Sequence, residues 1–395
     1  MTVADRAGTP MEERAMSHEA TASGEPPQCV VLGPFPPPVT GAAKNTQNML
    51  DALLTNGVRA EGISTAVALK RESSGLTYHF QRFGRILGVV GALFRARNRS
   101  GMLYIVPDAG LGTWYTVIYA VIGVLTFRRI VFHHRSFLYI TRPSPAMRLL
   151  VRLTRRKALH VFLSDNMRQS FAACYKPLDT AVAGNACFVQ KELAECEVPP
   201  HGNTITIGHL SNLRRNKGFF AAADTFERLA DDGLPVRLHL AGPITEQEVE
   251  PRLQALKARF GARVQWCGPV SGDAKVAFYR GLDVFLFATT HPQEAQPNVV
   301  YEALAAGIPV LATPRACIPE MLVDGSGACS PTEEEFVDFA VEAIRTMSFD
   351  SADRDRRRRA ILAQLAEDVQ RSQHQYKELL RTMGVLVERL SLPWL

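Results

Sequence analysis

The sequence lacks the cysteine patterns on which structural zinc sites and disulfide frameworks depend. Its seven cysteines form no CxxC pair, and their number is odd. Zinc modules pair cysteines at short spacings, and small secreted domains carry an even number for disulfides. The pattern therefore argues against both classes, and we expect free thiols in a reducing cytoplasm. The cysteines are Cys29, Cys174, Cys187, Cys196, Cys267, Cys317 and Cys329.

The sequence also has little excess of either charge. Its formal net charge is +6 over 395 residues, with an isoelectric point near 9.0. This excess favours anionic partners but is too mild to indicate a nucleic-acid-binding domain. Arginines supply most of it and cluster in Arg148–Lys157 and Arg354–Arg359. Hydrophobic residues at 46% and charged residues at 21% are typical of a globular protein.

Long apolar runs are scarce. Leu111–Phe127 carries no charge, but its 17 residues fall short of the roughly 20 that a bilayer span needs. The run lies between two strand-like segments, so a buried helix of a layered α/β domain explains it better than a membrane span. Residues 1–27 contain four glutamates and no apolar core. We expect them to be a disordered N-terminal lead and not a signal peptide.

Predicted strands and helices alternate along the chain in two series. The first opens with a strand at Cys29–Leu32, a loop rich in Gly and Pro at Gly33–Gly41, and a helix at Ala42–Thr55. Strand, glycine loop and helix is the opening of a doubly wound fold. The second series follows a Pro/Gly break at 199–202. Its predicted elements are Thr204–His209, Gly218–Leu229, Val236–Ala241, Glu246–Phe260, Val264–Cys267, Val284–Ala288 and Ile308–Ala312.

These two series predict an α/β protein of two Rossmann-like domains facing each other across a cleft, where a ligand commonly binds. We place the first domain at residues 28–200 and the second at 203–365. Residues 366–395 are expected to form a helical tail. The Arg-rich helical pattern from Ala352 onward is too polar to form a domain of its own.

The segment His291–Pro309 carries the strongest chemical signal. It follows the predicted strand Val284–Ala288, and a helix is expected to begin near Pro297 and to end at Gly307. Glu294 and Glu302 would then lie at the carboxyl edge of the sheet, where ligands bind in such folds. Free N–H groups at the helix start suit a diphosphate, and carboxylates suit sugar hydroxyls. A pair of glutamates at this spacing is also common on solvated helices. The residues around the pair therefore decide whether it is read as a ligand site.

In this context, Glu294 and Glu302, followed by Ala-Leu-Ala-Ala-Gly-Ile-Pro-Val, resemble the E-x7-E motif of the retaining GT-B glycosyltransferases of family 4, also called glycosyl transferases group 1. Other pieces resemble the same family in order and spacing, over roughly residues 28–365. They are the loop 211–218 with its lysine before glycine, the strand ends at Gly242 and Gly268, the strand at 281–287 and the glycine loop 33–41.

The resemblance implies a nucleotide-sugar donor held by the second domain and an acceptor read by the first. Lys217 would pair with the donor diphosphate, Glu302 would hold the ribose, and Glu294 would contact the donor sugar. Gly41 would allow close approach of the phosphates. His134 resembles the histidine that faces the donor sugar. The remaining donor-binding residues are expected to be Asn212, Arg214, Arg215, Gly242, Gly268, Gln296, Pro297, Asn298 and Val299.

Several of these assignments have alternatives. Lys217 could be a surface lysine, Gly41 an ordinary turn glycine and His134 a structural residue. His133 could face the cleft in place of His134, because neighbouring residues on a strand point to opposite sides.

The chain departs from the family pattern at two places. Ser211-Asn212-Leu213 replaces Gly-Arg-Leu, so Arg214 or Arg215 would have to supply the second positive charge on the diphosphate. Ala295-Gln296-Pro297 replaces a glycine-rich run, and proline has no N–H to offer the donor. The donor sugar and its base are therefore left open.

The resemblance implies transfer of a sugar to a hydroxyl with retention of anomeric configuration, without metal or other cofactor. Family members build surface polysaccharides and lipid-linked glycans, so we expect such an acceptor. A non-catalytic nucleotide-sugar-binding subunit of another transferase is the alternative. A nicotinamide enzyme is not favoured, because Gly33-x7-Gly41 is not GxGxxG.

Two basic stretches, Gln81–Arg99 and Arg142–Lys157, bear on where the protein acts. The first alternates apolar residues and arginines at helical spacing. It could be a core-facing helix with a solvated face, or a helix that binds an anionic membrane surface. The second possibility would place a cytoplasmic protein peripherally at the inner face of the membrane.

Overall fold

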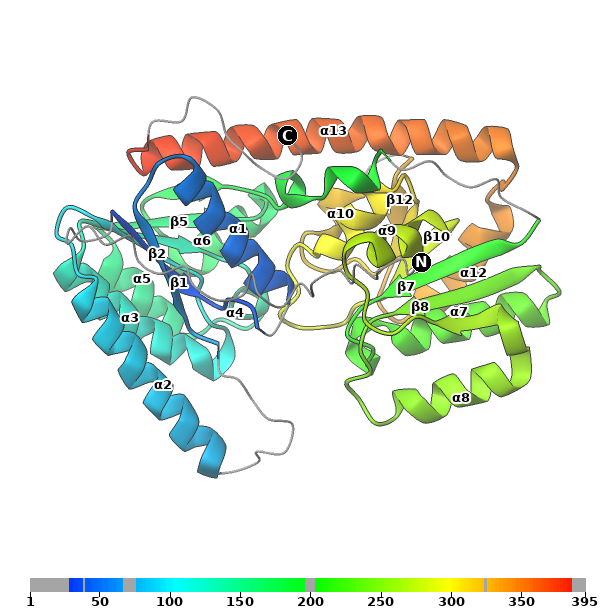
Figure 1. Cartoon of the computed structure of the whole chain (residues 1–395), viewed down its shortest axis with the longest axis horizontal. Helices are drawn as coiled ribbons and strands as arrows, with labels where there is room; N and C mark the ends of the chain where they lie inside the picture. The colour runs from blue at the N-terminus through cyan, green and yellow to red at the C-terminus, as the bar shows by residue number, and fades with distance from the viewer. Residues whose placement is uncertain (1–27, 38–39, 67–75, 196–202, 323–324, 386–395) are drawn as a thin grey trace, which may run out of the picture.

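The computed structural model describes residues 28–37, 40–66, 76–195, 203–322 and 325–385, apart from the side chains of residues 76–83. The expected lead at 1–27, the break at 199–202 and Cys196 lie outside these ranges. Within them, two α/β domains lie side by side, and one long helix runs across both (Figure 1).

The first domain is built on a parallel six-stranded sheet with strand order β2-β1-β3-β4-β5-β6. Every residue of β1 is buried, as expected for a strand of a parallel sheet that is covered on both faces. Its strands are β1 (Cys29–Gly33), β2 (Ala60–Ser64), β3 (Met102–Ile105), β4 (Arg129–His133), β5 (Ala158–Phe162) and β6 (Thr180–Val182). Its helices are α1 (Gly41–Thr55), α2 (Leu76–Arg95), α3 (Thr113–Thr126), α4 (Leu138–Thr141), α5 (Pro145–Thr154) and α6 (Asp165–Tyr175), with 3-10 turns at Gly110–Gly112, Ala186–Phe188 and Lys191–Leu193.

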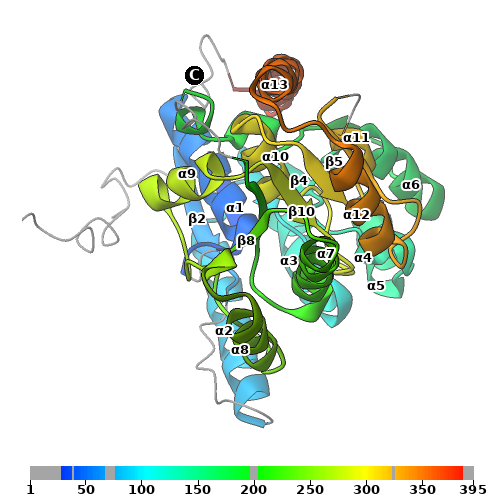
Figure 2. The same ribbon diagram turned by 90° about the vertical axis from the view of Figure 1, so that its right-hand side faces the viewer.

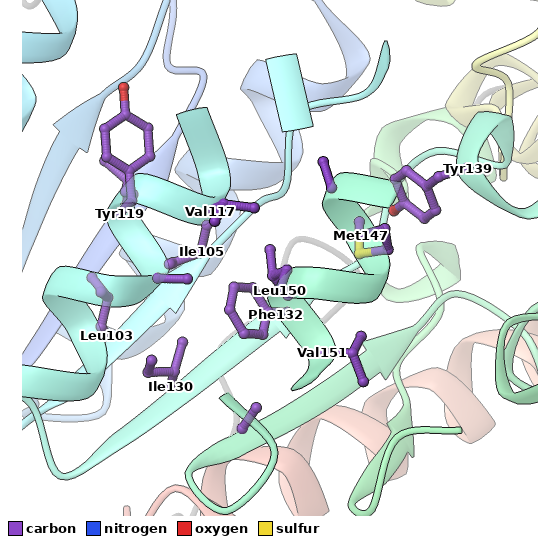
Figure 3. Close-up of a cluster of buried hydrophobic side chains, with 14 of the residues drawn as sticks. Leu103, Ile105, Val117, Tyr119, Ile130, Phe132, Tyr139, Met147, Leu150 and Val151 are labelled. Carbon is purple, nitrogen blue, oxygen red and sulfur yellow. The ribbon is translucent and has the colours of Figure 1, made fainter. Parts of the chain in front are cut away.

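Helices α3 and α5 cover one face of this sheet. Val117 of α3 and Leu150 of α5 pack with Ile105 and Phe132 of the strands in one buried cluster (Figure 3). The opposite face of the sheet packs against α1 and the end of the long helix.

The apolar run Leu111–Phe127 forms a helix, as expected, but the helix is not buried all round. The helix α3 packs inward through residues such as Val117 and Ala120, whereas Trp114 and Leu125 on its other side are 47% and 68% exposed. None of the helices in the described ranges combines the length and the apolar character that crossing a membrane demands.

The second domain repeats the architecture with strand order β12-β11-β10-β7-β8-β9, again all parallel. Its strands are β7 (Ile205–Leu210), β8 (Val236–Ala241), β9 (Val264–Trp266), β10 (Val284–Phe287), β11 (Val310–Ala312) and β12 (Gly327–Cys329). Its helices are α7 (Phe219–Asp231), α8 (Val249–Phe260), α9 (Gly272–Arg280), α10 (Asn298–Ala305), α11 (Ile318–Met321) and α12 (Phe336–Thr346), with 3-10 turns at Arg215–Lys217 and Gly261–Arg263. The predicted fold class, two parallel α/β domains, is confirmed.

The C-terminal pattern forms one helix, α13 (Ser351–Thr382), which passes over both domains (Figure 1). Figure 2 shows it end-on, outside the rest of the protein. Leu365 packs in a core of the second domain, whereas Tyr376 and Leu380 pack in a core of the first. The expected boundary at residue 365 therefore falls inside a continuous helix whose second half belongs to the first domain's core.

Candidate functional site

Lys217 and Glu294, predicted from two separate motifs, form an ion pair at the carboxyl edge of the second sheet. The Lys217 Nζ lies 2.6 Å from Glu294 Oε2, and the two side chains are only 18% and 12% exposed. Thr289, just after β10, places its hydroxyl 3.2 Å from the same carboxylate oxygen. The pair therefore joins a cation and an anion that are held in fixed positions and are both partly exposed.

Gly218 brings the lysine to this place. It has a φ of +93°, and a Cβ atom there would lie 2.8 Å from the backbone of Ala288 at the end of β10. Only glycine adopts this left-handed backbone conformation easily and, without a Cβ atom, comes this close to the strand. The short 3-10 turn Arg215–Lys217 is thereby pressed against the strand that leads to Glu294.

His291 lies beside this pair. Its pKa is lowered to about 4, first by burial and then by the positive charges of Lys217 and Arg214. The ring is therefore neutral at physiological pH, and its buried Nδ1 has no hydrogen-bond partner among the described residues. A buried nitrogen without a partner is suited to binding a ligand group.

The structure distinguishes the two candidate arginines. Arg215 pairs with Glu248 on the surface, and its guanidinium lies over the ring of Phe220. Arg214 is partly buried and close enough to His291 to lower its pKa. Arg214 is therefore the one available as a second cation beside Lys217.

Glu302, expected to hold a ribose, is buried and already has partners for both carboxylate oxygens. Lys275 of α9 places its Nζ 2.6 Å from Oε1, and Tyr279, one turn further on, lies 3.2 Å from Oε2. Lys44 of the first domain reaches the same group. Burial is the largest influence on the pKa of Lys44 and lowers it. The charge of Lys275 lowers this pKa further, and the charge of Glu302 raises it.

The start of α10 meets the first domain directly. Asn298, its first residue, exchanges amide hydrogen bonds of 3.1 and 3.2 Å with Asn45 of α1. A Cβ atom on Gly41 would lie 3.7 Å from Asn298 Nδ2. Pro297 precedes the helix and supplies no side-chain cap, so the helix start lies beside the glycine loop without a capping side chain.

Two other expected donor residues, Gln296 and Val299, have hydrogen-bond partners within the protein. Gln296 accepts a hydrogen bond from the Asn185 N–H at 2.6 Å and donates one to the Leu163 carbonyl at 3.2 Å, both in the first domain. The Val299 carbonyl accepts a hydrogen bond from Tyr279 at 3.3 Å. The Gln296 side chain therefore joins the domains, and its expected role in donor binding stays a prediction.

The other expected donor residues, Gly242, Gly268 and Asn212, differ in whether protein or open space surrounds them. A Cβ on Gly242 would lie 1.8 Å from the Ser211 carbonyl, so this glycine is required by packing and its Cα faces protein. Gly268, with a φ of +69°, has nothing within 4 Å of such a position. Asn212 is exposed. Of these three, Gly268 and Asn212 have open surroundings.

The expectation that His134 or His133 faces the cleft is wrong for this structure. Both rings are fully buried. His134 stacks on Phe162 and bonds His160 at 2.9 Å, whereas His133 lies against Tyr104 on the other side of the sheet. The side chains of these neighbouring residues do point to opposite faces of the first sheet, but a packed core covers each face. Burial lowers the pKa of His134 well below its usual value and keeps it neutral.

Lys275, Tyr279 and Lys44 were missed as site residues. The i, i+4 spacing of Lys275 and Tyr279 puts both on one face of α9, which the sequence shows. That this face meets Glu302 depends on how α9 packs against α10, which the sequence does not show.

Comparisons with known proteins agree with this architecture. Residues 204–348 match the model of the family described as glycosyl transferases group 1. A search of curated protein sequences gave no match. Solved structures with similar folds include HepE of Anabaena in complex with UDP-glucose, at 18% identity, with 90% of this chain and 99% of that chain covered and a TM-score of 0.64.

Two further structures are similar. The UDP-forming α,α-trehalose-phosphate synthase of Burkholderia xenovorans matches at 14% identity over 91% of this chain and 100% of that one, with a TM-score of 0.64. A glycosyltransferase of Rickettsia africae matches at 13% identity over 90% and 99%, also with a TM-score of 0.64. The chain has the GT-B fold, and the group 1 match in its second domain, taken with that fold, supports a GT-B glycosyltransferase.

Proposed function

We propose that the protein transfers a sugar from a nucleotide diphosphate sugar to a hydroxyl acceptor, with retention of anomeric configuration. The observation that carries the proposal is the Lys217–Glu294 ion pair at the carboxyl edge of the second sheet. The pair combines a cation for a leaving diphosphate with a carboxylate for sugar hydroxyls.

A uridine diphosphate sugar is the proposed donor class. HepE was solved with UDP and with UDP-glucose, and the Burkholderia enzyme is described as UDP-forming. In this chain, Lys217 and Arg214 would bind the diphosphate, and the uncapped start of α10 would offer its N–H groups to the same group. Lys217 would offset the developing charge without a metal ion.

The bond changes are those of a front-face substitution. The acceptor oxygen forms a bond to the anomeric carbon as the bond from that carbon to the phosphate oxygen breaks. The acceptor proton passes to the departing phosphate oxygen, and a nucleoside diphosphate leaves. Glu294 orients the sugar in this scheme and is not the nucleophile. Neither buried histidine, His133 or His134, has a part in it.

The proposed acceptor is a glycan or a lipid-linked intermediate of surface polysaccharide synthesis. The proposed place is the cytoplasmic side of a membrane, to which the protein binds peripherally. The free thiols of the described cysteines fit a reducing compartment.

The test measures nucleoside diphosphate release from UDP-glucose and other UDP, GDP and ADP sugars, with water or an added sugar as acceptor. Removing one preorganised hydrogen-bond donor from an active site costs about 10²- to 10³-fold in rate. We expect Lys217→Ala and Glu294→Ala to lose at least this much at a temperature at which both variants remain folded. Each breaks a partly buried ion pair, so each should melt somewhat below the wild type. Arg237→Ala and Glu367→Ala, at exposed positions away from the site, are the matched controls. Equal turnover in site and control variants would remove the assignment.

A nucleotide-sugar-binding subunit without catalysis is the second candidate. It is favoured by the burial of His133 and His134, which leaves the donor sugar without the histidine that the resembled family places beside it. Such a protein would show a higher melting temperature with UDP-glucose but no release of UDP at any enzyme concentration.

A further inference from the structure

A row of large apolar side chains lies exposed along the outer side of α3 and of the 3-10 turn that precedes it. Leu111, Trp114, Ile118, Val121 and Leu125 are between 40% and 84% exposed. They are spaced three or four residues apart, so they form one stripe on the helix. On the neighbouring helix α5, Leu149 and Leu153 are also exposed. We call these seven residues the α3 face.

A stripe of this kind is unusual for a surface helix. The inward side of α3 already fills the core beneath it, so folding of the domain does not need a second apolar side. Contiguous apolar patches on a protein surface mark a binding site for another surface.

A basic hollow lies where α3 ends. Arg128, Arg129, Arg155, Arg156 and Lys157 line a space of about 560 Å³ together with Leu178 and Asp179. Arg129 pairs with Asp179, and the Lys157 ammonium binds the Val124 and Phe127 carbonyls at 2.7 and 3.0 Å, which caps α3. Arg128, Arg155 and Arg156 are exposed, and no ion pair joins them to an acid in the described part of the chain.

The surrounding sequence is almost free of acids. Residues 81–164 contain fourteen Lys and Arg residues and a single acid, Asp108. The whole chain has a net charge of only +6, so the rest of the molecule is acidic on balance. The positive charge is therefore concentrated in the part of the chain that contains the α3 face.

The face also has a defined position relative to the candidate site. Helix α3 leaves the carboxyl edge of the first sheet after β3 and returns to the amino edge, where β4 begins. Leu111 therefore lies toward the edge that carries Gly41 and meets Asn298, and Leu125 lies toward the basic hollow. A surface bound along this face would reach from the hollow to the side of the molecule that carries the candidate site.

We propose that the α3 face and the basic hollow bind the surface of an anionic lipid bilayer. The arginines contact lipid phosphates, and Trp114 and the leucines enter the interface between headgroups and acyl chains. A second copy of this chain is a poor occupant, because it would bring two strongly basic surfaces together. That this binding brings the protein to a lipid-linked acceptor rests on the proposed function. The binding to the bilayer does not depend on the reaction.

The experiment is flotation of the whole protein with vesicles of phosphatidylcholine alone and of phosphatidylcholine mixed with phosphatidylglycerol. We expect binding to the anionic vesicles only, weakened by salt. Arg155→Glu combined with Arg156→Glu should lower the bound fraction at least tenfold. Trp114→Ser combined with Leu125→Ser should lower it to a similar extent. Arg237→Glu and Leu54→Ser, at exposed positions on other elements, are the matched controls and should bind as the wild type does.

Melting temperatures show whether each variant folds. UDP release with a water-soluble acceptor should be unchanged by the α3-face variants, which separates this inference from the proposed reaction. Equal binding to both kinds of vesicle, or equal loss in test and control variants, would overturn the proposal. Self-association that disappears in Trp114→Ser without any vesicle binding, or binding only to an acidic protein, would overturn it as well.

Discussion

His209 shows how burial of a single side chain makes folding depend on pH. Its ring is fully buried between β7 and β10, with Nδ1 donating to the Leu286 carbonyl at 3.0 Å and Nε2 accepting from Ser211 at 2.9 Å. Burial lowers its pKa to about 4, against about 6.5 in an unfolded chain. The unfolded chain therefore binds the proton more tightly. The stability that the neutral ring contributes is complete above pH 6.5 and is lost as the pH falls toward 4.

This difference in pKa corresponds to about 2–3 kcal/mol of unfolding free energy between pH 7 and pH 4.5. We expect His209→Gln, which retains hydrogen-bonding groups but cannot titrate there, to show a correspondingly smaller loss on acidification. Urea unfolding at the two pH values measures it. His374→Gln, at an exposed position, is the control. If His209→Gln loses as much unfolding free energy between the two pH values as the wild type does, this histidine does not carry the effect.

Lys275 and Glu302 allow a second test at the residue scale. Both side chains are about one-tenth exposed, so removing the lysine leaves a buried carboxylate without its main partner. Loss of one member of such a pair costs about 3 kcal/mol, and Lys44 nearby reduces this cost. We expect Lys275→Ala to be destabilised by about 2–3 kcal/mol in urea unfolding, and Lys275→Met combined with Glu302→Gln to be close to the wild type. Arg280→Ala, at an exposed position on the same helix α9, should change little.

At the scale of elements, the sequence predicts what depends on local patterns. The strand at Val236–Ala241 was predicted with the bounds that the structure gives, because its run of β-forming residues ends at a glycine. Lys217 and Glu294 were found because each lies in its own motif. The contact of Gln296 with the first domain could not be predicted, because the sequence around a polar loop residue does not show which partner it meets in the other domain.

Helix α13 shows the same limit. Its helical pattern and its polarity are evident in the sequence, but the sequence does not show what it covers. The few apolar residues in its second half, among them Tyr376 and Leu380, complete the core of the first domain. Ser372 donates a hydrogen bond to the Gly184 carbonyl at 2.6 Å, so a polar residue also belongs to this contact.

This packing makes α13 a tether that can be tested. Tyr376 is fully buried, and truncation of a large aromatic side chain in a core costs about 3–5 kcal/mol. We expect Tyr376→Ala to lower the unfolding free energy of the first domain by about this amount, measured by urea unfolding. The exposed His374→Ala on the same helix should leave it unchanged. If both variants unfold like the wild type, α13 does not stabilise the first domain.

At the scale of the whole molecule, the two domains are joined by more than the helix. Gln296 bonds Asn185 and Leu163, and Asn185 Nδ2 donates to the Gln296 carbonyl at 3.0 Å. Ala295, next to it, is buried in the core of the first domain. The loop between β10 and α10 therefore carries Glu294 for the candidate site and, two residues on, the side chain that fixes the distance between the domains.

Gln296→Glu tests this coupling with almost no change in shape. The substituted side chain still accepts from the Asn185 N–H, but it places a carboxylate oxygen where an amide donated to the Leu163 carbonyl. A partly buried charge opposite a carbonyl oxygen is unfavourable, and water reaches the new carboxylate fully only when the domains separate. We expect a larger radius of gyration in small-angle X-ray scattering and a loss of about 2–3 kcal/mol in unfolding free energy. Gln265→Glu, exposed on β9, makes the same chemical change away from the interface and should alter neither quantity. An unchanged radius together with unchanged stability in Gln296→Glu would mean that the loop does not hold the domains together, and that α13 and the Asn45–Asn298 pair do so instead.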